Sequence, residues 1–490
     1  MLVGAGWMLL SLAVPAAAQT ESGQDVRLRL DQQLDRQRSD NEARTLEEAE
    51  PLDGAPASIV IDGETYSVGN SVDDVGRALY LSITRKQWRD VRRFLASYQK
   101  LAGHDPMLIL YAQGGLAREA GDLAKAEQHY GALLKIKPDF LPGQLELARV
   151  LFENLKDREA RNAFDDARTI LAGEGDKAEG VRRSVDAYLA ALKRRRGWQG
   201  NFAVGPSYSS NLNQSSGSYT CLLAVPDGSC AIERKVPDPI KATGIGFEGT
   251  LGRTVPLSGH HSLRARAIVY GDIYPDKHDY SQTTMMARAG YQYQSARNII
   301  SLSPSFELGT LASSELYRAW GANAEWQHTA AQNILLRIEA NYRDFRYRQP
   351  FYGAQDGPLV DVNITGWYVA SPSLTIFGGP DFARKDTSDP IDSYGQWGGR
   401  IGVNKTFGTS ASLLLLTSYR YRKHHAYSEL LEGQRRDKQY NVTAIARFPA
   451  FQLAGVVPEI IVQHNRVKSS IDWLYSYKRT SVSIRLSYAF

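Results

Sequence analysis

Two cysteines and two histidine pairs are the residues of this sequence whose chemistry stands out first. Cys221 and Cys230 lie nine positions apart, but no further ligand pattern nearby would complete a metal site. A small disulfide in an oxidising exterior is the simpler interpretation of this pair. His260-His261 and His424-His425 have no partnered Cys, Asp or Glu pattern, so we interpret them as histidines of a surface or rim.

A glycine-rich stretch, GIGFEG at residues 244–249, has the literal form G-x-G-x-x-G. A dinucleotide site needs a helix and a βαβ unit after such a stretch, and the following residues predict neither. Glycine in a strand instead relieves curvature or leaves space beside it. Because the sequence has no nucleophile elbow, P-loop or metalloprotease motif, we expect no enzyme, no catalytic or metal-binding residue and no cofactor.

Composition and charge suit an envelope protein. The 490 residues include 26 Tyr and 42 Gly but two Cys, which is typical of a strand-rich envelope protein. A formal net charge of +5 argues against a nucleic-acid partner. Residues 1–18 combine an apolar run with Pro15, Ala16 and Ala18, the A-x-A form of a signal peptide, although the usual basic start is absent. After residue 19 no run approaches 18 apolar residues, so a membrane form has to be a closed barrel.

Residues 19–70 are a charged segment, poor in large apolar residues from Gln24 to Glu50. We interpret this segment as a solvated helix or a disordered arm without a specific binding role.

Residues 71–197 predict a stack of helices built from an internal repeat. Ala160, Phe164 and Ala167 follow Ala126, Tyr130 and Leu133 by 34 positions each, which is the period of the tetratricopeptide helix-turn-helix repeat. The predicted core of the repeats comprises Gly121, Ala126, Tyr130, Ala160 and Phe164. The first helices should line a concave surface near Tyr111, Arg118, Arg149 and Phe152. Either these residues form a groove for a protein partner or they are a solvated face, and the sequence leaves both open.

The hydrophobic period changes from 3.6 to 2 at Lys193–Trp198, which reads KRRRGW. Four basic residues before an indole could bind an anionic partner. A membrane-interface anchor is the simpler interpretation, with the cations at phosphate level and Trp198 in the aromatic belt.

Residues 198–490 predict a transmembrane antiparallel β-barrel of about 14 strands. The strand candidates begin near residues 199, 240, 261, 279, 297, 315, 332, 359, 373, 394, 411, 436, 456 and 480. An even count fits a bacterial outer-membrane barrel, with apolar side chains outward and polar ones in the lumen. The overall fold class is therefore α+β multidomain, an N-terminal tetratricopeptide-like solenoid followed by the barrel.

The lengths of the connections support a membrane barrel over a soluble sandwich. Very short turns fall at Ser295-Ala296, Thr329-Ala330, Ser371-Pro372 and Gly408-Thr409, on every second connection from the fourth strand onward, interrupted only by a modest Phe448–Ala454 link. Long polar loops fall on the other set, around residues 211–239, 346–358, 384–393, 423–435 and 466–479. Short turns at one end and long loops at the other are typical of outer-membrane barrels.

The last ten residues, SVSIRLSYAF, alternate strictly. We interpret the apolar set as the signal by which outer-membrane barrels are recognised for assembly: Val482, Ile484, Leu486, Tyr488 and Phe490. The last strand should pair with the strand near Trp198 and so remove an open sheet edge.

A signal peptide, a short tetratricopeptide stack and a 14-strand barrel resemble the surface lipoprotein assembly modulators (Slam), the outer-membrane translocators of type XI secretion. The resemblance covers residues 71–490, and its most particular signature is NFAVGPSYSSNLNQSS, with Asn211, Asn213 and Gln214 in an N-x-N-Q segment. It implies a protein of the Gram-negative outer membrane with its helical domain in the periplasm. It also implies a client, either a surface lipoprotein or a secreted haem- or metal-binding protein, that is moved to the cell surface or exterior. Outer-membrane lipid, the barrel assembly machinery and a periplasmic chaperone are the other expected partners.

An exporter of polysaccharide is the alternative function, because such exporters also join tetratricopeptide repeats to a barrel. We expect rows of one charge in the lumen for a charged sugar, whereas Arg337, Glu339 and Arg343 mix signs. A ligand-gated porin would leave the helical half unexplained. For the translocator, our hypothesis is that client folding outside, together with strand-edge pairing near the barrel seam, drives transfer.

Overall fold

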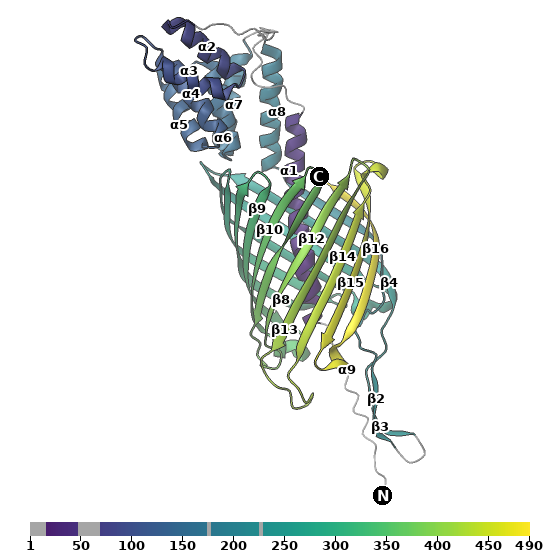
Figure 1. The fold of residues 1–490 in the computed structure, drawn as a ribbon. Helices are drawn as coiled ribbons and strands as arrows, with labels where there is room; N and C mark the ends of the chain where they lie inside the picture. The colour runs from purple at the N-terminus through teal and green to yellow at the C-terminus, as the bar shows by residue number, and fades with distance from the viewer. Residues whose placement is uncertain (1–15, 48–68, 174–177, 225–228) are drawn as a thin grey trace.

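The computed structural model describes residues 16–47, 69–173, 178–224 and 229–490, which form a helical domain, a closed β-barrel and one long helix inside the barrel (Figure 1). The helices are α1 (Ala16–Glu47), α2 (Val72–Thr84), α3 (Trp88–Tyr98), α4 (Pro106–Glu119), α5 (Leu123–Ile136), α6 (Leu141–Glu153), α7 (Asp157–Leu171), α8 (Glu179–Arg196) and α9 (Asp472–Tyr475). Within the described residues, no helix is both long and apolar enough to cross a bilayer.

The helical domain, α2 to α8, is held together by an apolar core at the repeat positions. Ala126, Ala160 and Phe164 are fully buried and Tyr130 nearly so. The Tyr130 ring lies against Gly114 of α4, where an added Cβ would come within 2.7 Å of the ring. Small residues at these crossings therefore let neighbouring helices approach closely.

Local signals set the ends of these helices. The Asp105 side chain accepts a hydrogen bond from the Met107 backbone N–H at 2.8 Å, and Pro106 occupies the first turn of α4. Gly121 follows α4 with φ +75°, a conformation that favours glycine, so the chain turns there and enters α5.

The barrel strands are β1 (Gln199–Ser209), β4 (Ala242–Pro256), β5 (His261–Ile273), β6 (Gln282–Gln294), β7 (Asn298–Leu311), β8 (Ser314–Ala331), β9 (Ile334–Tyr347), β10 (Gly357–Ser371), β11 (Leu374–Lys385), β12 (Tyr394–Phe407), β13 (Ala411–His424), β14 (Arg436–Arg447), β15 (Val456–Ser469) and β16 (Tyr477–Ala489). Each pairs antiparallel with its sequence neighbours, and β1 closes the barrel on β16 with Asn201 opposite Ala489 and Tyr208 opposite Val482. Short 3-10 turns lie at Pro275–Tyr280, Pro350–Gln355 and Pro449–Phe451. All fourteen predicted strands are present, each starting within three residues of its predicted position.

Alternation sorts side chains to the two faces of the barrel wall. In β16 the exposed large apolar residues are Val482, Ile484, Leu486 and Tyr488, and Phe490 follows them on the outside, whereas Ser483 and Ser487 are buried on the inside. The GIGFEG stretch lies within β4. An extended strand lacks the strand-to-helix turn of a dinucleotide site, and an added Cβ at Gly244 would meet the Ile273 carbonyl oxygen at 2.4 Å.

Long loops and short turns segregate to opposite ends, with two differences from the prediction. Thr329-Ala330 belongs to β8, and the turn itself is residues 332–333. The β7–β8 connection, on the long-loop end, is only Ala312-Ser313, both with positive φ.

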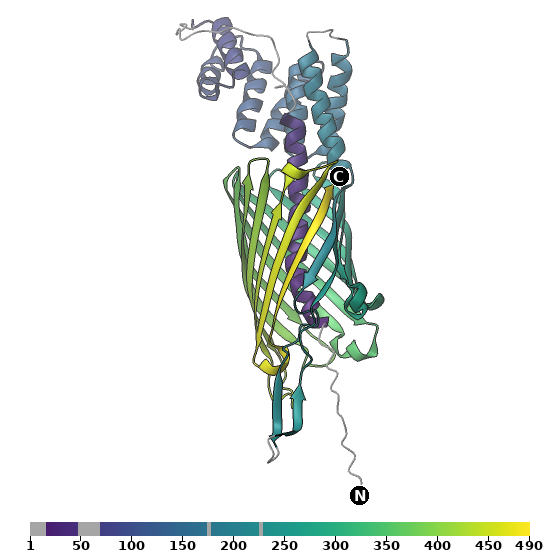
Figure 2. The ribbon, with the colours of Figure 1, turned by 90° about the vertical axis from the view of Figure 1, so that its right-hand side faces the viewer.

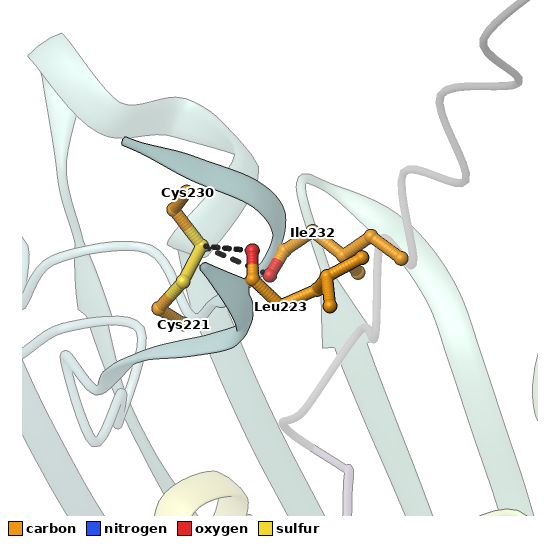
Figure 3. Close-up of a disulfide and its surroundings, with 4 residues drawn as sticks. All are labelled: Cys221, Leu223, Cys230 and Ile232. Atoms are coloured by element: carbon orange, nitrogen blue, oxygen red, sulfur yellow. Dashed lines mark hydrogen bonds between the residues drawn. A yellow bond between two sulfur atoms is a disulfide. The ribbon is translucent and has the colours of Figure 1, made fainter. Parts of the chain in front are cut away.

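The first long loop contains a hairpin that sequence reasoning missed. Strands β2 (Tyr219–Ala224) and β3 (Cys230–Lys235) pair with each other outside the barrel, and a disulfide joins Cys221 to Cys230 with their Cα atoms 5.8 Å apart (Figure 3). At the base of this loop the Asn211 side chain donates hydrogen bonds to the carbonyls of Ser215 at 2.8 Å and Lys478 at 3.0 Å. The N-x-N-Q segment thus fastens the hairpin to β16.

For the described part of the segment before the helical domain, a helix was one of the two predicted forms and is confirmed, but its predicted solvation was wrong. Helix α1 runs through the barrel (Figures 1 and 2). Its residues Leu30 and Leu34 have no exposed surface. The charges that neutralise α1 lie in strands more than 200 residues away in the sequence. The charged residues of the segment therefore had no visible partners, and their pattern suggested solvation. Residues 48–68 of the predicted arm, and residues 1–15 of the predicted signal peptide, lie outside the described residues; 16–18 are in the first turn of α1.

Candidate functional site in the barrel lumen

Helix α1 fills the barrel lumen from one end to the other. Its 32 residues correspond to about 48 Å at 1.5 Å per residue, more than the roughly 30 Å hydrocarbon thickness of a bilayer. The Ala16 end lies toward the long loops, and the Glu47 end emerges beside the helical domain (Figure 1). Gln37 marks the second end, where its side chain donates to the Gly200 carbonyl at 3.0 Å and the Phe490 carbonyl at 3.2 Å.

Four barrel arginines surround two aspartates in the middle of α1. This arginine cluster consists of Arg264, Arg266, Arg288 and Arg337, from β5, β6 and β9. Asp35 accepts hydrogen bonds from Arg264 at 3.0 Å, Arg266 at 2.6 Å and Arg337 at 2.5 Å. Asp31 accepts from Arg266 and, with both carboxylate oxygens, from Arg288 at 3.1 Å. The two aspartates, one helical turn apart, therefore bond to all four guanidinium groups.

The other faces of α1 bond to charges that also have a partner in the barrel wall. Arg29 donates two hydrogen bonds to Glu248, at 2.8 and 2.5 Å, and Arg485 donates to the same carboxylate at 2.6 Å. Asp25 accepts from Arg420 at 2.6 Å, and Arg420 also donates to Asp381 at 2.9 Å. Each barrel group would keep one partner if α1 left.

Little space remains beside the helix. Two cavities between α1 and the strands have volumes of about 10 Å³ each. That volume is close to the least that holds one water molecule, so neither cavity could hold a polypeptide while α1 is in place.

Where α1 leaves the barrel, a latch joins it to the helical domain. The latch consists of Glu42 of α1, Arg195 of α8 and Asp157 of α7. Arg195 donates to Glu42 at 2.6 and 2.7 Å and to Asp157 at 2.6 Å, and its guanidinium lies 3.8 Å above the centre of the Phe152 ring. Leu46 packs on the core of α6 to α8. Arg195 thus turns inward and not toward lipid headgroups as the basic run KRRRGW predicted.

Burial and charge act in opposite directions on the latch. Burial alone would lower the pKa of Arg195, but the hydrogen bonds that it donates to Glu42 and the charge of Asp157 raise the pKa overall. Burial raises the pKa of Asp157 despite the opposing charge of Arg195. Arg195 therefore remains a cation, and Asp157 depends on it as a partner.

Two family models match this chain. The model described as "Surface lipoprotein assembly modifier" matches residues 198–490, and the model of that family's N-terminal TPR repeats matches residues 65–164. The chain belongs to the surface lipoprotein assembly modifier family. The predicted resemblance and fold class are confirmed.

Curated relatives match almost the whole chain. The hemophilin secretion modulator of Acinetobacter baumannii is 35% identical over 95% of this chain and 96% of its own length. Surface lipoprotein assembly modifier 1 of Neisseria meningitidis serogroup B is 24% identical over 88% of this chain and 85% of its own. The surface lipoprotein assembly modifier of Pasteurella multocida is 24% identical over 85% and 83%.

This family member is an outer-membrane translocator of the Gram-negative envelope with a tetratricopeptide domain, as predicted. The helical domain sits at the short-turn end of the barrel, where the Gly259 N–H donates to Glu159 of α7 at 2.7 Å and the Gln294 amide donates to the Leu155 carbonyl at 3.4 Å. That end faces the periplasm. The polysaccharide-exporter alternative is not favoured by these relatives.

The four residues predicted to line a client groove each contact other residues of the helical domain. Arg118 donates to Glu153 of the same domain at 2.6 Å, and Arg149 donates to Glu146 at 3.1 Å. Phe152 is buried beneath Arg195, and Tyr111 lies edge-on to Tyr130 with ring centres 5.9 Å apart. Arg149 and Phe152 are thus packed inside the domain, and client binding by the group stays a prediction.

The lumen residues of the translocator were only partly predictable. Arg337, Glu339 and Arg343 were expected in the lumen, and all three are buried there. Asp31 and Asp35 were missed. Their spacing of four residues, with Leu30 and Leu34 beside them, was the available signal of a helix with a buried polar face.

Proposed function

We propose that this chain moves a secreted client protein across the outer membrane through its own barrel, after the helical domain has bound the client in the periplasm. The observation that supports this most directly is α1 itself, a polypeptide segment that occupies the bore over its whole length (Figure 2). Charged groups of the wall hold much of this segment. A bore that accommodates one polypeptide in this way has the width and polarity to accommodate another.

We propose further that the client is a soluble secreted protein of the haem- or metal-binding kind. Identity of 35% to the hemophilin secretion modulator, against 24% to surface lipoprotein assembly modifier 1, supports this choice. A surface lipoprotein is the alternative client. Outer-membrane lipid around the barrel, the assembly machinery that inserts it and a periplasmic chaperone that delivers the client complete the proposed partners.

Transfer in this proposal needs no catalytic residue and no nucleotide. Helix α1 has to leave the lumen first, and ion pairs make that exit feasible. Water can refill a polar lumen and solvate both the arginines and the departing aspartates, so the net free energy of such buried pairs is small compared with their Coulomb attraction. Folding of the client outside prevents its return and gives the transfer its direction.

A reversible lock between α1 and the barrel tests the proposal. Leu34 lies beside Gly252 of β4, where an added Cβ would be 3.0 Å from the Leu34 Cδ2 atom. Cells that co-express the client with the double variant Leu34→Cys and Gly252→Cys should export little client under oxidising conditions and regain export with a mild reductant. The measurement is client in the culture medium or, for a lipoprotein, protease shaving of intact cells.

Each single cysteine variant is the matched control and should export client with or without the reductant. Export through a fully cross-linked barrel at the level of the unmodified protein would show that the lumen is not the route.

A further inference from the structure

The arginine cluster is short of barrel carboxylates. Among the described residues, the wall carboxylates within 4.0 Å of these four guanidinium groups are Glu325 and Glu339. Glu325 lies 3.5 Å from Arg264 and 3.7 Å from Arg337, and Glu339 lies 3.1 Å from Arg288. Four cations thus face two anions of the wall, and Asp31 and Asp35 of α1 supply the other two.

The balance of charge differs along the wall. Arg400 and Arg420 share one wall carboxylate, Asp381, and Arg420 also bonds to Asp25 of α1. At Arg343 the balance is reversed, because that guanidinium bonds to both Glu307 at 2.9 Å and Asp361 at 2.6 Å. Arg38 of α1, at the edge of the cluster, donates to the Thr254 hydroxyl at 3.2 Å. The cluster is therefore a local site for carboxylates.

We propose that the arginine cluster is a binding site for an acidic segment of the exported polypeptide, with two carboxylates about one helical turn apart, and that Asp31 and Asp35 occupy this site in the resting protein. The inference rests on the proposed function, because the client has to cross the lumen that α1 fills. A client segment with the same pair of carboxylates replaces the hydrogen bonds that α1 gives up. Exchange between equivalent carboxylates avoids the state in which four buried arginines face only two carboxylates.

The site also discriminates among segments. A neutral segment would leave the cluster with excess positive charge in a confined bore, and a basic segment would add to that charge. Direct carboxylate–guanidinium bonds at fixed spacing distinguish an acidic peptide from a diffuse polyanion, which would be attracted without matching the spacing.

Ion-current block by synthetic peptides tests the site without any client. The full-length double variant Asp31→Asn and Asp35→Asn, purified and inserted in planar lipid bilayers, should conduct more than the unmodified chain because α1 is held less tightly. The probe is a helical peptide of about 16 residues, or about four turns, with two Asp four positions apart and no other charged side chain, added on the periplasmic side. It should half-block the current at a concentration at least about tenfold lower than the same peptide with two Asn, and a peptide with two Lys should be weakest.

Two further lumen variants in the same background show where the peptide binds. Adding Arg266→Gln and Arg337→Gln should abolish the preference for Asp over Asn, whereas the matched control Arg343→Gln should leave it unchanged. The inference is overturned if the Asp and Asn peptides block equally, if the preference survives the two cluster substitutions, or if dextran sulfate of equal charge blocks as well as the Asp peptide.

Folding and function are separated in this design. Heat modifiability on gels identifies folded barrels, and the single variant Asp35→Asn replaces the double variant if that variant does not assemble. Because no client is present, failure of the peptide preference leaves the export result of the cysteine lock unaffected, and failure of the lock leaves the peptide result unaffected.

Discussion

The helical domain and the barrel lumen bury their interiors with opposite chemistry. Ala126, Tyr130 and Phe164 make an apolar core in the helical domain, whereas the lumen wall buries charged residues such as Arg420 and Asp381, both nearly without exposed surface. Apolar packing loses its free energy when the contact opens, because the surfaces then meet water. When charged contacts open in a lumen that water can enter, hydration of the separated charges largely offsets the lost Coulomb attraction. Opening the core of the helical domain is therefore costly, whereas opening the contacts of the lumen costs less.

The largest expected effect is on the apolar side of this comparison. Phe164→Ala removes a fully buried ring and should destabilise the helical domain by about 3–5 kcal/mol. Urea unfolding followed by the helical circular dichroism signal measures the loss, and heat modifiability should show an intact barrel. Ile170→Ala, on the exposed side of the same helix, is the matched control. A loss no greater than that of the control would contradict the role of Phe164 as core.

An intermediate effect is expected at the latch, where the two kinds of interior meet. Arg195→Ala removes hydrogen bonds to Glu42 and Asp157 and leaves the buried Asp157 carboxylate without this cation, a cost of about 2–4 kcal/mol. Hydrogen exchange of the α1 amides near Glu42 should accelerate, because the end of α1 is released from the helical domain.

The control for the latch is Arg161→Ala, since Arg161 makes an exposed pair with Asp165 at 3.5 Å. That variant should leave exchange in α1 unchanged. Equal protection of the α1 amides in the Arg195 and Arg161 variants would mean that the latch does not hold the helix.

The smallest effect is expected within the lumen. Arg29→Gln removes two hydrogen bonds to Glu248, but Arg485 still donates to that carboxylate. We expect a loss of only about 1 kcal/mol for the docked helix, seen as roughly fivefold faster exchange of the α1 amides with the barrel melting unchanged. If Arg29→Gln destabilised the docked helix by about 3 kcal/mol or more, the cost would match that of Phe164→Ala. The lumen contacts would then be as costly to open as the apolar core.

The sequence predicted the parts of the molecule whose signals are local. Every barrel strand was predicted, because two-residue alternation and turn composition repeat within about ten residues. The helical stack was predicted from positions 34 apart. These patterns need no knowledge of distant partners.

The lumen contacts could not be predicted in the same way. Asp31 and Arg266 are separated by 235 residues, and Arg29 and Glu248 by 219, so nothing in the neighbourhood of α1 indicates which charges will neutralise it. A charged segment has the same composition whether water or a barrel wall surrounds it. The predicted solvation of residues 19–47 was therefore wrong, although a helix was one of the predicted forms. The β2–β3 hairpin was missed because its strands are only six residues each.

The position of α1 sets an order on biogenesis. The helix is synthesised before any strand, yet the seam between β1 and β16 can form only once the last residues exist. Either the barrel closes around α1, which then already lies between β1 and β16, or α1 enters the closed barrel from its periplasmic end. In both cases a segment of the translocator itself, α1, is the first polypeptide to occupy the lumen.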